Sequence, residues 1–274
     1  MTVPFENDTG NIVRKLARKS LKSEKRRNLM VVIAVALASC LICFSIVMAL
    51  STRQIEKNHV EDTYEAVYTK ITEEDVSSLK GLDDFSRVGE YYMLAVEPAE
   101  QGYNASYIYC DEETMYIARD QMKLLEGRLP QKEDEVVVSR YFLSNYGADA
   151  GIGEKVMLSS ESFHGEYTVT GILEGYKEKE VNGTSILLSK EALKGWSGYD
   201  PADYRAYVHF KNEQQMDETE LTARSREIAK EYQLEMPVMN LSYMKFYKQP
   251  VNVSMLALVA GIAVLVIIGG YVVI

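Results

Sequence analysis

Residues 124–158 read LLEGRLPQKEDEVVVSRYFLSNYGADAGIGEKVML, and this stretch decides how the middle of the chain folds. At its centre, EVVVS at 135–139 is a short run of β-branched residues, which predicts a buried strand. The segment GADAGIGEKV at 147–156 has the glycine content that is typical of a turn between a helix and a strand. The stretch therefore predicts short strands alternating with short helices.

Further signals of the same kind lie on both sides of this stretch. The segments EYTVTGIL at 166–173 and YRAYVHF at 204–210 alternate with period two, as half-buried strands do. Short helices are expected to begin at Thr72 and Ser189, because each of these capping residues precedes a helical segment that ends at a glycine. The middle of the chain therefore predicts an α+β domain, a mixed sheet with packed helices, in either one or two lobes.

One longer helix is expected at 216–233, MDETELTARSREIAKEYQ. Helical spacing places four residues on one stripe that would pack on the sheet, namely Leu221, Ser225, Ile228 and Tyr232. Glu220 and Arg224 stand four residues apart, so they are expected to form an ion pair along the helix.

Two long apolar runs without charged side chains flank this polar middle. They are LMVVIAVALASCLICFSIVMAL at 29–50 and the segment at 251–274. At 1.5 Å per residue, about 20 residues cross a hydrocarbon core roughly 30 Å thick. Each run is therefore predicted to be a transmembrane helix.

The charge of the chain is distributed unevenly around these runs. Residues 1–30 carry eight Lys/Arg against three Asp/Glu, although the whole chain has a net charge of −10. Under the positive-inside rule the basic flank stays in the cytoplasm, so the acidic middle lies outside and the second run returns the chain to the cytoplasm. The predicted organisation is a cytoplasmic basic segment at 1–28, transmembrane helices at 29–50 and 251–274, and an extracytoplasmic domain at 51–250.

The basic flank and the first run allow other interpretations. Residues 11–27 place apolar side chains near one helical face among cations, which favours an amphipathic helix on the inner leaflet, although a simple basic stop signal would give the same topology. A cleaved secretory signal is disfavoured, because its apolar core is only about 7–15 residues long and follows a short basic region. The motif LASC at 37–40 resembles a lipoprotein signal, but the apolar run continues beyond Cys40.

No motif in the chain indicates catalysis or ligand binding. The three histidines, His59, His164 and His209, have no neighbour at metal-ligand spacing, and Cys110 is the only cysteine outside the apolar runs. Neither a phosphate-binding loop nor a nucleophile elbow can be found among the glycine-containing segments. The sequence therefore predicts no catalytic, cofactor-binding or metal-binding residue, and ATP-driven work would require another polypeptide.

Three stretches together carry a family resemblance: RKLARKSLKSEKRRNLMVVIAVALA at 14–38, the stretch at 124–158, and YTVTGILEGY at 167–176. The first resembles the basic helix and first span of FtsX-like permeases with a MacB-type extracytoplasmic core domain. The second resembles the G-R-x-P turn, E-V-V-V-S strand, short helix and I-G-x-x-V-x-L strand of that family, and the third resembles the strand that follows. The resemblance implies a subunit of an ABC transporter in a bacterial plasma membrane, without enzymatic activity or cofactor of its own.

The same resemblance implies a set of partners. They are a separate cytoplasmic ATPase, the lipid bilayer, a second permease copy in a dimer, and an extracytoplasmic peptide, lipoprotein or envelope protein, with no nucleic acid. In this family the ATPase cycle moves the membrane helices, which pass the movement to the outer domain, an arrangement called mechanotransmission.

The sequence departs from the family pattern after the second run. Family members continue into a cytoplasmic coupling helix and further spans, so the chain is expected to be a fragment of a longer permease, with a natural short form as the alternative. The main rival function is a two-span sensor receptor with an extracellular ligand-binding domain, truncated before its signalling module. A two-span organiser of envelope polymers is a third interpretation, and the short elements of the middle region speak against its long coiled coils.

Overall fold

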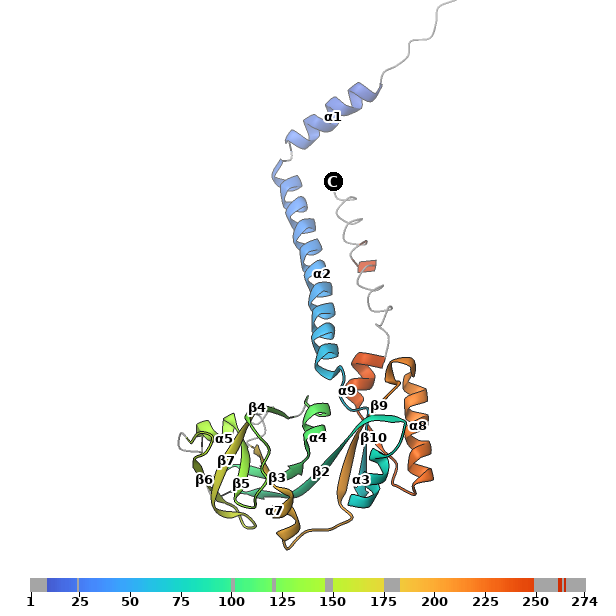
Figure 1. Cartoon of the computed structure of the whole chain (residues 1–274). Coiled ribbons are helices and arrows are strands. Elements are labelled where there is room, and N and C mark those ends of the chain that lie inside the picture. Colours follow the sequence, from blue (N-terminus) through green and yellow to red (C-terminus); the bar gives the residue numbers. More distant parts are fainter. Residues whose placement is uncertain are drawn as a thin grey trace, which may run out of the picture. The chain divides into compact units, whose positions relative to one another are not determined.

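A computed structural model describes residues 9–23, 25–99, 102–119, 122–145, 150–174 and 183–248, together with 261, 262 and 264. The chain divides into two compact units, one formed by residues 1–55 and 250–274 and the other by residues 56–249 (Figure 1). The second unit carries the sheet and is called the core domain below.

The first unit contains helix α1 (Thr9–Ser23) and most of helix α2 (Lys25–Val60). Helix α1 confirms that the basic flank is helical. Within the described residues, one helix is long and apolar enough to cross a membrane by length and composition, the segment Leu29–Val60 of α2. This helix continues ten residues past the predicted end of the span at Leu50. The predicted second span at 251–274 lies outside the described residues, apart from 261, 262 and 264, which are helical.

The described strands of the core domain form one mixed sheet, which confirms the predicted α+β class. The order is β10-β1-β9-β2-β3-β8-β5-β7-β4, with β6 beside β7. Most neighbours are antiparallel, whereas β3 pairs with β8 and β5 with β7 in parallel. The strands are β1 (Ala66–Ile71), β2 (Phe85–Pro98), β3 (Asn104–Cys110), β4 (Lys123–Gly127), β5 (Glu135–Ser139), β6 (Lys155–Ser159), β7 (His164–Glu174), β8 (Gly183–Leu188), β9 (Tyr204–Phe210) and β10 (Val238–Met239).

The pairing of β2 with β3 joins the two halves of this sheet, each of which has its own helices (Figure 1). The remaining elements of the core domain are α3 (Glu73–Lys80), α4 (Glu112–Ile117), α5 (Arg140–Asn145), α7 (Lys190–Gly195), the 3₁₀-helix η1 (Glu213–Gln215), α8 (Glu218–Glu231), α9 (Leu241–Tyr243) and the π-helix η2 (Met244–Lys248).

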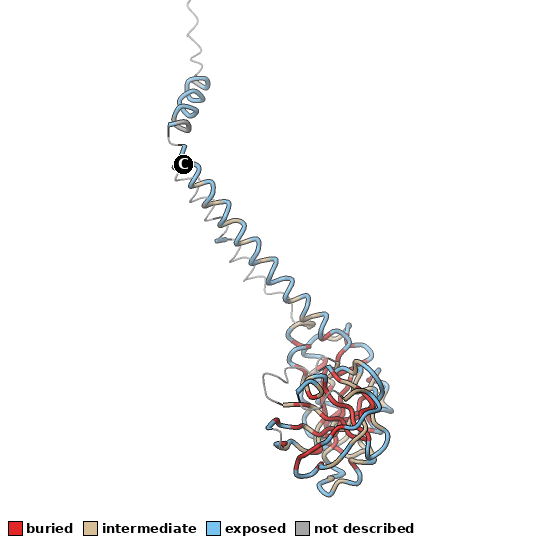
Figure 2. The backbone as a smooth tube through the Cα atoms, turned by 90° about the vertical axis from the view of Figure 1, so that its left-hand side faces the viewer, coloured by how far each residue is buried: buried red, intermediate tan, exposed pale blue. Residues whose placement is uncertain are grey.

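Apolar side chains cover both faces of the sheet. Neighbouring residues such as Tyr91 and Tyr92, or Val137 and Val138, belong to two different hydrophobic clusters, because successive side chains of a strand point to opposite faces. The larger cluster includes residues of α3 and α8, and the smaller one includes Ile117 of α4. Figure 2 shows these buried residues gathered in the core domain, whereas α2 is mostly exposed.

The predicted strands at 135–139 and 204–210 coincide with β5 and β9. All five residues of β5 are buried, since this strand lies between β7 and β8 in the interior of the sheet. A strand that is covered on both faces has no need for polar residues at alternate positions, which explains the continuous run of valines.

The predicted helix caps are also present. Thr72 and Asp75 form a capping box at the start of α3, and the Ser189 side chain accepts a hydrogen bond from the Ala192 N–H at the start of α7. Each cap satisfies a backbone donor that has no partner within the helix.

The predicted 216–233 helix is observed as α8, but its side chains differ from the prediction in two respects. Of the expected stripe, Leu221, Ser225 and Ile228 are buried, while Tyr232 is only half-buried at the helix end. The predicted Glu220–Arg224 ion pair is wrong, as the following contacts explain.

Both partners of that predicted pair are engaged elsewhere. The Glu220 carboxylate accepts the backbone N–H of Asp217 at 3.0 Å in a capping box. Arg224 binds the carboxylate of Asp84 through Nε and Nη2, at 2.7 and 2.9 Å. A two-point guanidinium–carboxylate contact is stronger than a single exposed pair along a helix, so the distant partner prevails.

Candidate functional site

The chain enters and leaves the core domain at one place, which we call the entry–exit joint (residues 60–66 and 238–248, with His209 beside them). Strand β1 pairs with β10 so that Ala66 lies opposite Met239. The backbone N–H of Asn240 donates to the carbonyl of Glu65 at 2.8 Å, and its Nδ2 donates to the carbonyl of Tyr64 at 2.9 Å. Segments about 170 residues apart in sequence are thereby fastened side by side.

The end of α2 is built into this joint. Val60, the last residue of the helix, is buried in the hydrophobic core, and the Thr63 hydroxyl donates to the Val60 carbonyl at 2.7 Å. Asp62 has a φ of 53°, the left-handed conformation in which a helix commonly stops. The helix therefore ends in the interior of the domain, with five residues between its last residue and the start of β1 at Ala66.

A buried carboxylate and a histidine occupy the centre of the joint. The Glu65 side chain is 0% exposed and lies 2.7 Å from Nδ1 of His209, which is 13% exposed. The backbone N–H of Phe210 donates to the second oxygen of Glu65 at 2.8 Å. These two contacts compensate a carboxylate that would otherwise be very costly to bury.

Burial and pairing move the titration of both groups. Burial raises the pKa of the Glu65 carboxyl, although the hydrogen bond and charge of His209 oppose the change. Burial acts to lower the pKa of His209, but the hydrogen bond and charge of Glu65 outweigh it, so the pKa of the imidazole is raised above its ordinary value.

The G-R-x-P turn forms a second organised site, which we call the Arg128–Glu135 clamp. Arg128 donates from Nη1 and Nη2 to the two carboxylate oxygens of Glu135 at 2.8 and 2.7 Å. The backbone N–H groups of Gln131 and Lys132 donate to the same carboxylate. The Arg128 guanidinium and these N–H groups lower the pKa of Glu135 to about 2. The clamp closes the turn that leads into β5.

Gly127 allows the clamp to lie against the sheet. It has a φ of +83°, and a Cβ at this position would come within 2.2 Å of the Thr170 carbonyl oxygen. Only glycine satisfies both the positive φ and the close approach to the backbone of β7. The glycine of the G-R-x-P turn thus has a steric explanation.

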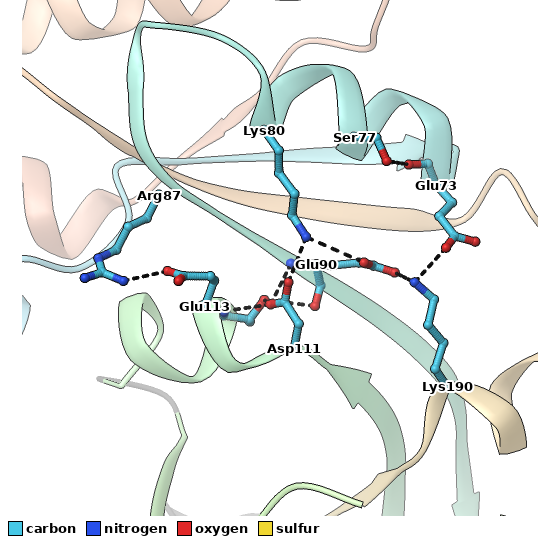
Figure 3. A network of polar contacts seen from close by, with 9 residues as sticks. Glu73, Ser77, Lys80, Arg87, Glu90, Asp111, Glu113 and Lys190 are labelled. Carbon is cyan, nitrogen blue, oxygen red and sulfur yellow. Dashed lines mark hydrogen bonds and ion pairs between the residues drawn. The ribbon is translucent and has the colours of Figure 1, made fainter. Parts of the chain in front are cut away.

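A third polar cluster joins α3, β2, α4 and α7 (Figure 3). The Glu90 carboxylate, 8% exposed, lies 2.6 Å from Nζ of Lys190 and 3.7 Å from Nζ of Lys80. Asp111 pairs with Lys80 at 3.0 Å, and Glu73 pairs with Lys190 at 2.7 Å. The ion pairs of Glu90 with Lys80 and Lys190 connect helices α3 and α7 to strand β2.

The remaining candidates from the sequence lie apart from one another. His59 and His164 are exposed, whereas Cys110 is buried, and burial raises the pKa of its thiol. Across the part of the chain that the structure describes, no group of three His, Cys, Asp or Glu side chains could hold a metal ion. No local pattern in the sequence points to the joint, except that His209 occupies a polar position of an alternating strand.

The comparison with protein families gives a decisive match: the profile described as the MacB-like periplasmic core domain covers residues 29–226. The chain belongs to this family. The match confirms the predicted resemblance to FtsX-like permeases with a MacB-type core domain, and the chain is therefore a component of an ABC-type transporter permease with an extracytoplasmic domain. No curated protein matches the MacB-like chain.

Several solved structures are similar to the MacB-like chain. The extracellular domain of the noncanonical ABC-type transporter YknZ from Gram-positive bacteria is 16% identical, with a TM-score of 0.46, covering 65% of this chain and 100% of that one. The periplasmic region of MacB from Actinobacillus actinomycetemcomitans is 10% identical, with a TM-score of 0.46 and coverage of 68% and 91%. A domain of a putative permease from Porphyromonas gingivalis is 16% identical, with a TM-score of 0.43 and coverage of 71% and 96%.

Proposed function

We propose that this chain is the part of a permease through which a separate cytoplasmic ATPase moves the core domain on the outer side of a bacterial plasma membrane. The entry–exit joint is the observation that carries this proposal. Helix α2 ends at a buried residue, Val60, and strand β1 follows after five residues. A movement of this helix end is therefore passed directly to strand β1, next to the edge of the sheet, because no long flexible linker lies between them.

The return segment supports the same mechanism. Because β10 pairs with β1 and Asn240 holds the carbonyls of Tyr64 and Glu65, a force on the chain on either side of the domain acts on the same few residues. Packed elements of this kind transmit small displacements, since they cannot deform continuously.

The proposed topology follows the charge distribution. Residues 29–50 and 251–274 span the bilayer, the basic segment 1–28 stays in the cytoplasm, and residues 51–250 lie outside. The proposed partners are the ATPase, a second permease copy in a dimer, and an extracytoplasmic peptide, lipoprotein or envelope protein. We assign no catalytic step to the chain, because the carboxylates of its polar clusters are engaged in ion pairs and hydrogen bonds.

The proposal is tested with the protein that carries this chain, tagged at its amino terminus, purified from membranes and examined for a co-purifying ATPase. The complex is reconstituted, and hydrogen exchange of the amides of β1 and β10 is followed by mass spectrometry with and without ATP. We expect an ATPase to co-purify and ATP to change exchange in both strands.

Two variants make this experiment specific to the joint. Asn240→Ala removes the contact with Tyr64 and should abolish the ATP-dependent change while the ATPase still co-purifies. Ser242→Ala, at an exposed position two residues away, should behave like the unmodified protein. Recovery of a signalling kinase in place of an ATPase would favour the sensor receptor, and an unchanged ATP response in Asn240→Ala would refute the role of the joint.

A further inference from the structure

An open pocket with a volume of about 420 Å³ lies in the core domain next to the entry–exit joint. Its walls come from the last turns of α2, from η1 and the start of α8, and from η2. The lining residues include Lys57, Tyr247, Lys248, Gln214, Gln215 and Asp217. The volume is within the range of about 300–1,000 Å³ that is typical of small-molecule pockets.

Two lysines converge on one aromatic ring in this pocket. The Nζ of Lys57 lies 4.9 Å from the centre of the Tyr247 ring, and the Nζ of Lys248 lies 5.5 Å from it. Tyr247 stacks on the buried Tyr243, with the ring centres 5.0 Å apart, which holds the ring in place. Lysines on different elements, α2 and η2, are thus brought together by the fold.

Neither of these two lysines forms an ion pair with a carboxylate within the described residues. Lys248 donates to the carbonyl oxygen of Glu213. Nearby acids are already engaged with backbone N–H groups: Asp217 accepts from Glu220 at 2.8 Å, and Glu213 accepts from Gln214 at 2.5 Å. The pocket therefore contains two lysines without a direct ion pair to any described carboxylate, together with amide donors from two glutamines, although the charges of Glu213 and Asp217 act on Lys248.

The position of Lys57 and Lys248 along the chain indicates that an anion bound in this pocket would come from the membrane surface. Lys57 stands seven residues beyond Leu50 in the same helix, about 10 Å along its axis at 1.5 Å per residue. Lys248 stands three residues before the apolar run that starts at 251. The headgroup regions increase the thickness of the bilayer from about 30 Å for the hydrocarbon core to about 40–45 Å in total. The long side chains of lysines at these distances therefore reach the headgroup layer.

We propose that this pocket binds the headgroup of an anionic phospholipid, with Lys57 and Lys248 contacting the phosphate and Tyr247 packing against the glycerol region. The proposal rests on the membrane placement given above under the proposed function. An occupied pocket would join the end of α2 to the return segment through the lipid, and so couple the joint to the composition of the outer leaflet.

The test uses the full chain in zwitterionic detergent, titrated with short-chain phosphatidylglycerol or phosphatidylcholine and followed by native mass spectrometry. We expect phosphatidylglycerol to bind more tightly. Lys57→Gln should weaken its binding by about fivefold, the change that one lysine makes near an anionic surface. Lys248→Gln should have an effect of similar size, but Lys57→Gln is the primary variant because Lys248 also holds Glu213.

The matched control is Lys230→Gln, an exposed lysine in the last turn of α8, far along the helix from the pocket. It should leave binding unchanged. Equal binding of the two lipids, or an equal loss in Lys230→Gln, would overturn the proposal. Displacement of the lipid by equimolar inorganic phosphate would also overturn it, since the ligand would then be a free phosphate.

The membrane placement is measured separately, by carbonate extraction of membranes and by digestion of the core domain with protease added on the outer side of the membrane. If carbonate releases the chain from membranes, or if protease added outside does not reach the core domain, the proposed function is contradicted. The lipid titration in detergent still reports on the pocket in that case. The two failures are therefore distinguishable.

Discussion

The Arg128–Glu135 clamp and the entry–exit joint both hold a carboxylate against a cationic or titratable partner, but they do so in different surroundings. In the clamp the partners are seven residues apart and Arg128 is about half exposed. In the joint, Glu65 and His209 are 144 residues apart, and both are largely or wholly removed from water. The clamp organises one turn, whereas the joint connects the two ends of the domain.

Because the two sites differ in burial, they should contribute unequally to the stability of the whole domain. Water screens the half-exposed guanidinium, and the backbone N–H groups of Gln131 and Lys132 still bind the Glu135 carboxylate if Arg128 is lost, so the clamp should act locally. A carboxylate that is 0% exposed has little access to water, so the loss of His209 removes its charged partner and leaves the Phe210 N–H, while the loss of Glu65 leaves Nδ1 of the buried His209 without its partner.

The largest effect is expected from Glu65→Ala. It leaves the Phe210 N–H and the His209 ring without their buried acceptor, so the free energy of unfolding should fall by about 3–5 kcal/mol. Urea denaturation measures the change. Glu166→Ala serves as the matched control, because its pair with Lys155 is exposed and should contribute about 0.5 kcal/mol. Similar losses in the two variants would remove the distinction between buried and exposed pairs.

The second effect concerns the glycine before the clamp. Gly127→Ala should lower the free energy of unfolding by about 2–3 kcal/mol, because the new Cβ meets the Thr170 carbonyl and the backbone has a positive φ. Gly153→Ala is the matched control, since Gly153 has a φ of +88° with open space around it, so the substitution introduces backbone strain without a steric clash. If thermal unfolding gave the same loss for both, the close approach to β7 would be unimportant.

The third effect is a pH dependence that originates in the joint. His209 has a raised pKa in the folded state, so it contributes stability that is fully present below its ordinary value of about 6.5 and is lost as pH rises through the folded pKa. Glu65 acts in the same direction at lower pH, because its pKa is also raised. The free energy of unfolding should therefore fall as the pH rises above about 6.5.

His209→Gln should flatten this dependence, as measured by urea denaturation in a series of buffers. His164→Gln, at an exposed position of β7, should retain the slope of the unmodified chain. A slope that survives in His209→Gln would assign the pH dependence to another group.

The smallest effect is expected in the clamp. Glu135 has a pKa lowered to about 2, so it contributes stability above its ordinary value of 4.5 that is lost as the pH falls through about 2. Arg128→Lys replaces a two-point contact by a single charge and should raise this pKa toward 4.5, although not fully, because the backbone donors remain. Titration by ¹³C NMR measures the carboxyl pKa directly. Lys132→Ala, which keeps its backbone N–H, should leave the pKa in place.

The clamp and the joint also differ in how far the sequence predicted them. The strand at 135–139 and the helix caps at Thr72 and Ser189 are predicted from the sequence because each depends on residues within a few positions of one another, whereas the turn before the strand is implied by the family resemblance. The Glu220–Arg224 pair failed for the opposite reason: both partners had better local or distant alternatives, which spacing alone does not disclose.

The first apolar run, the α+β class of the middle region and the family resemblance are all evident before the fold is known, and the family match confirms the resemblance. The apolar run and the fold class follow from composition and short-range periodicity, whereas the resemblance depends on the motifs at 14–38, 124–158 and 167–176. Only the tertiary structure decided that Glu65 meets His209, that Asn240 closes the domain against Tyr64, and that Lys57 and Lys248 converge on Tyr247. The contact of Glu65 with His209 joins residues 144 positions apart and depends on the order of strands β10, β1 and β9. Strand order is set by the packing of the whole sheet, so no local pattern of side chains predicts such a contact.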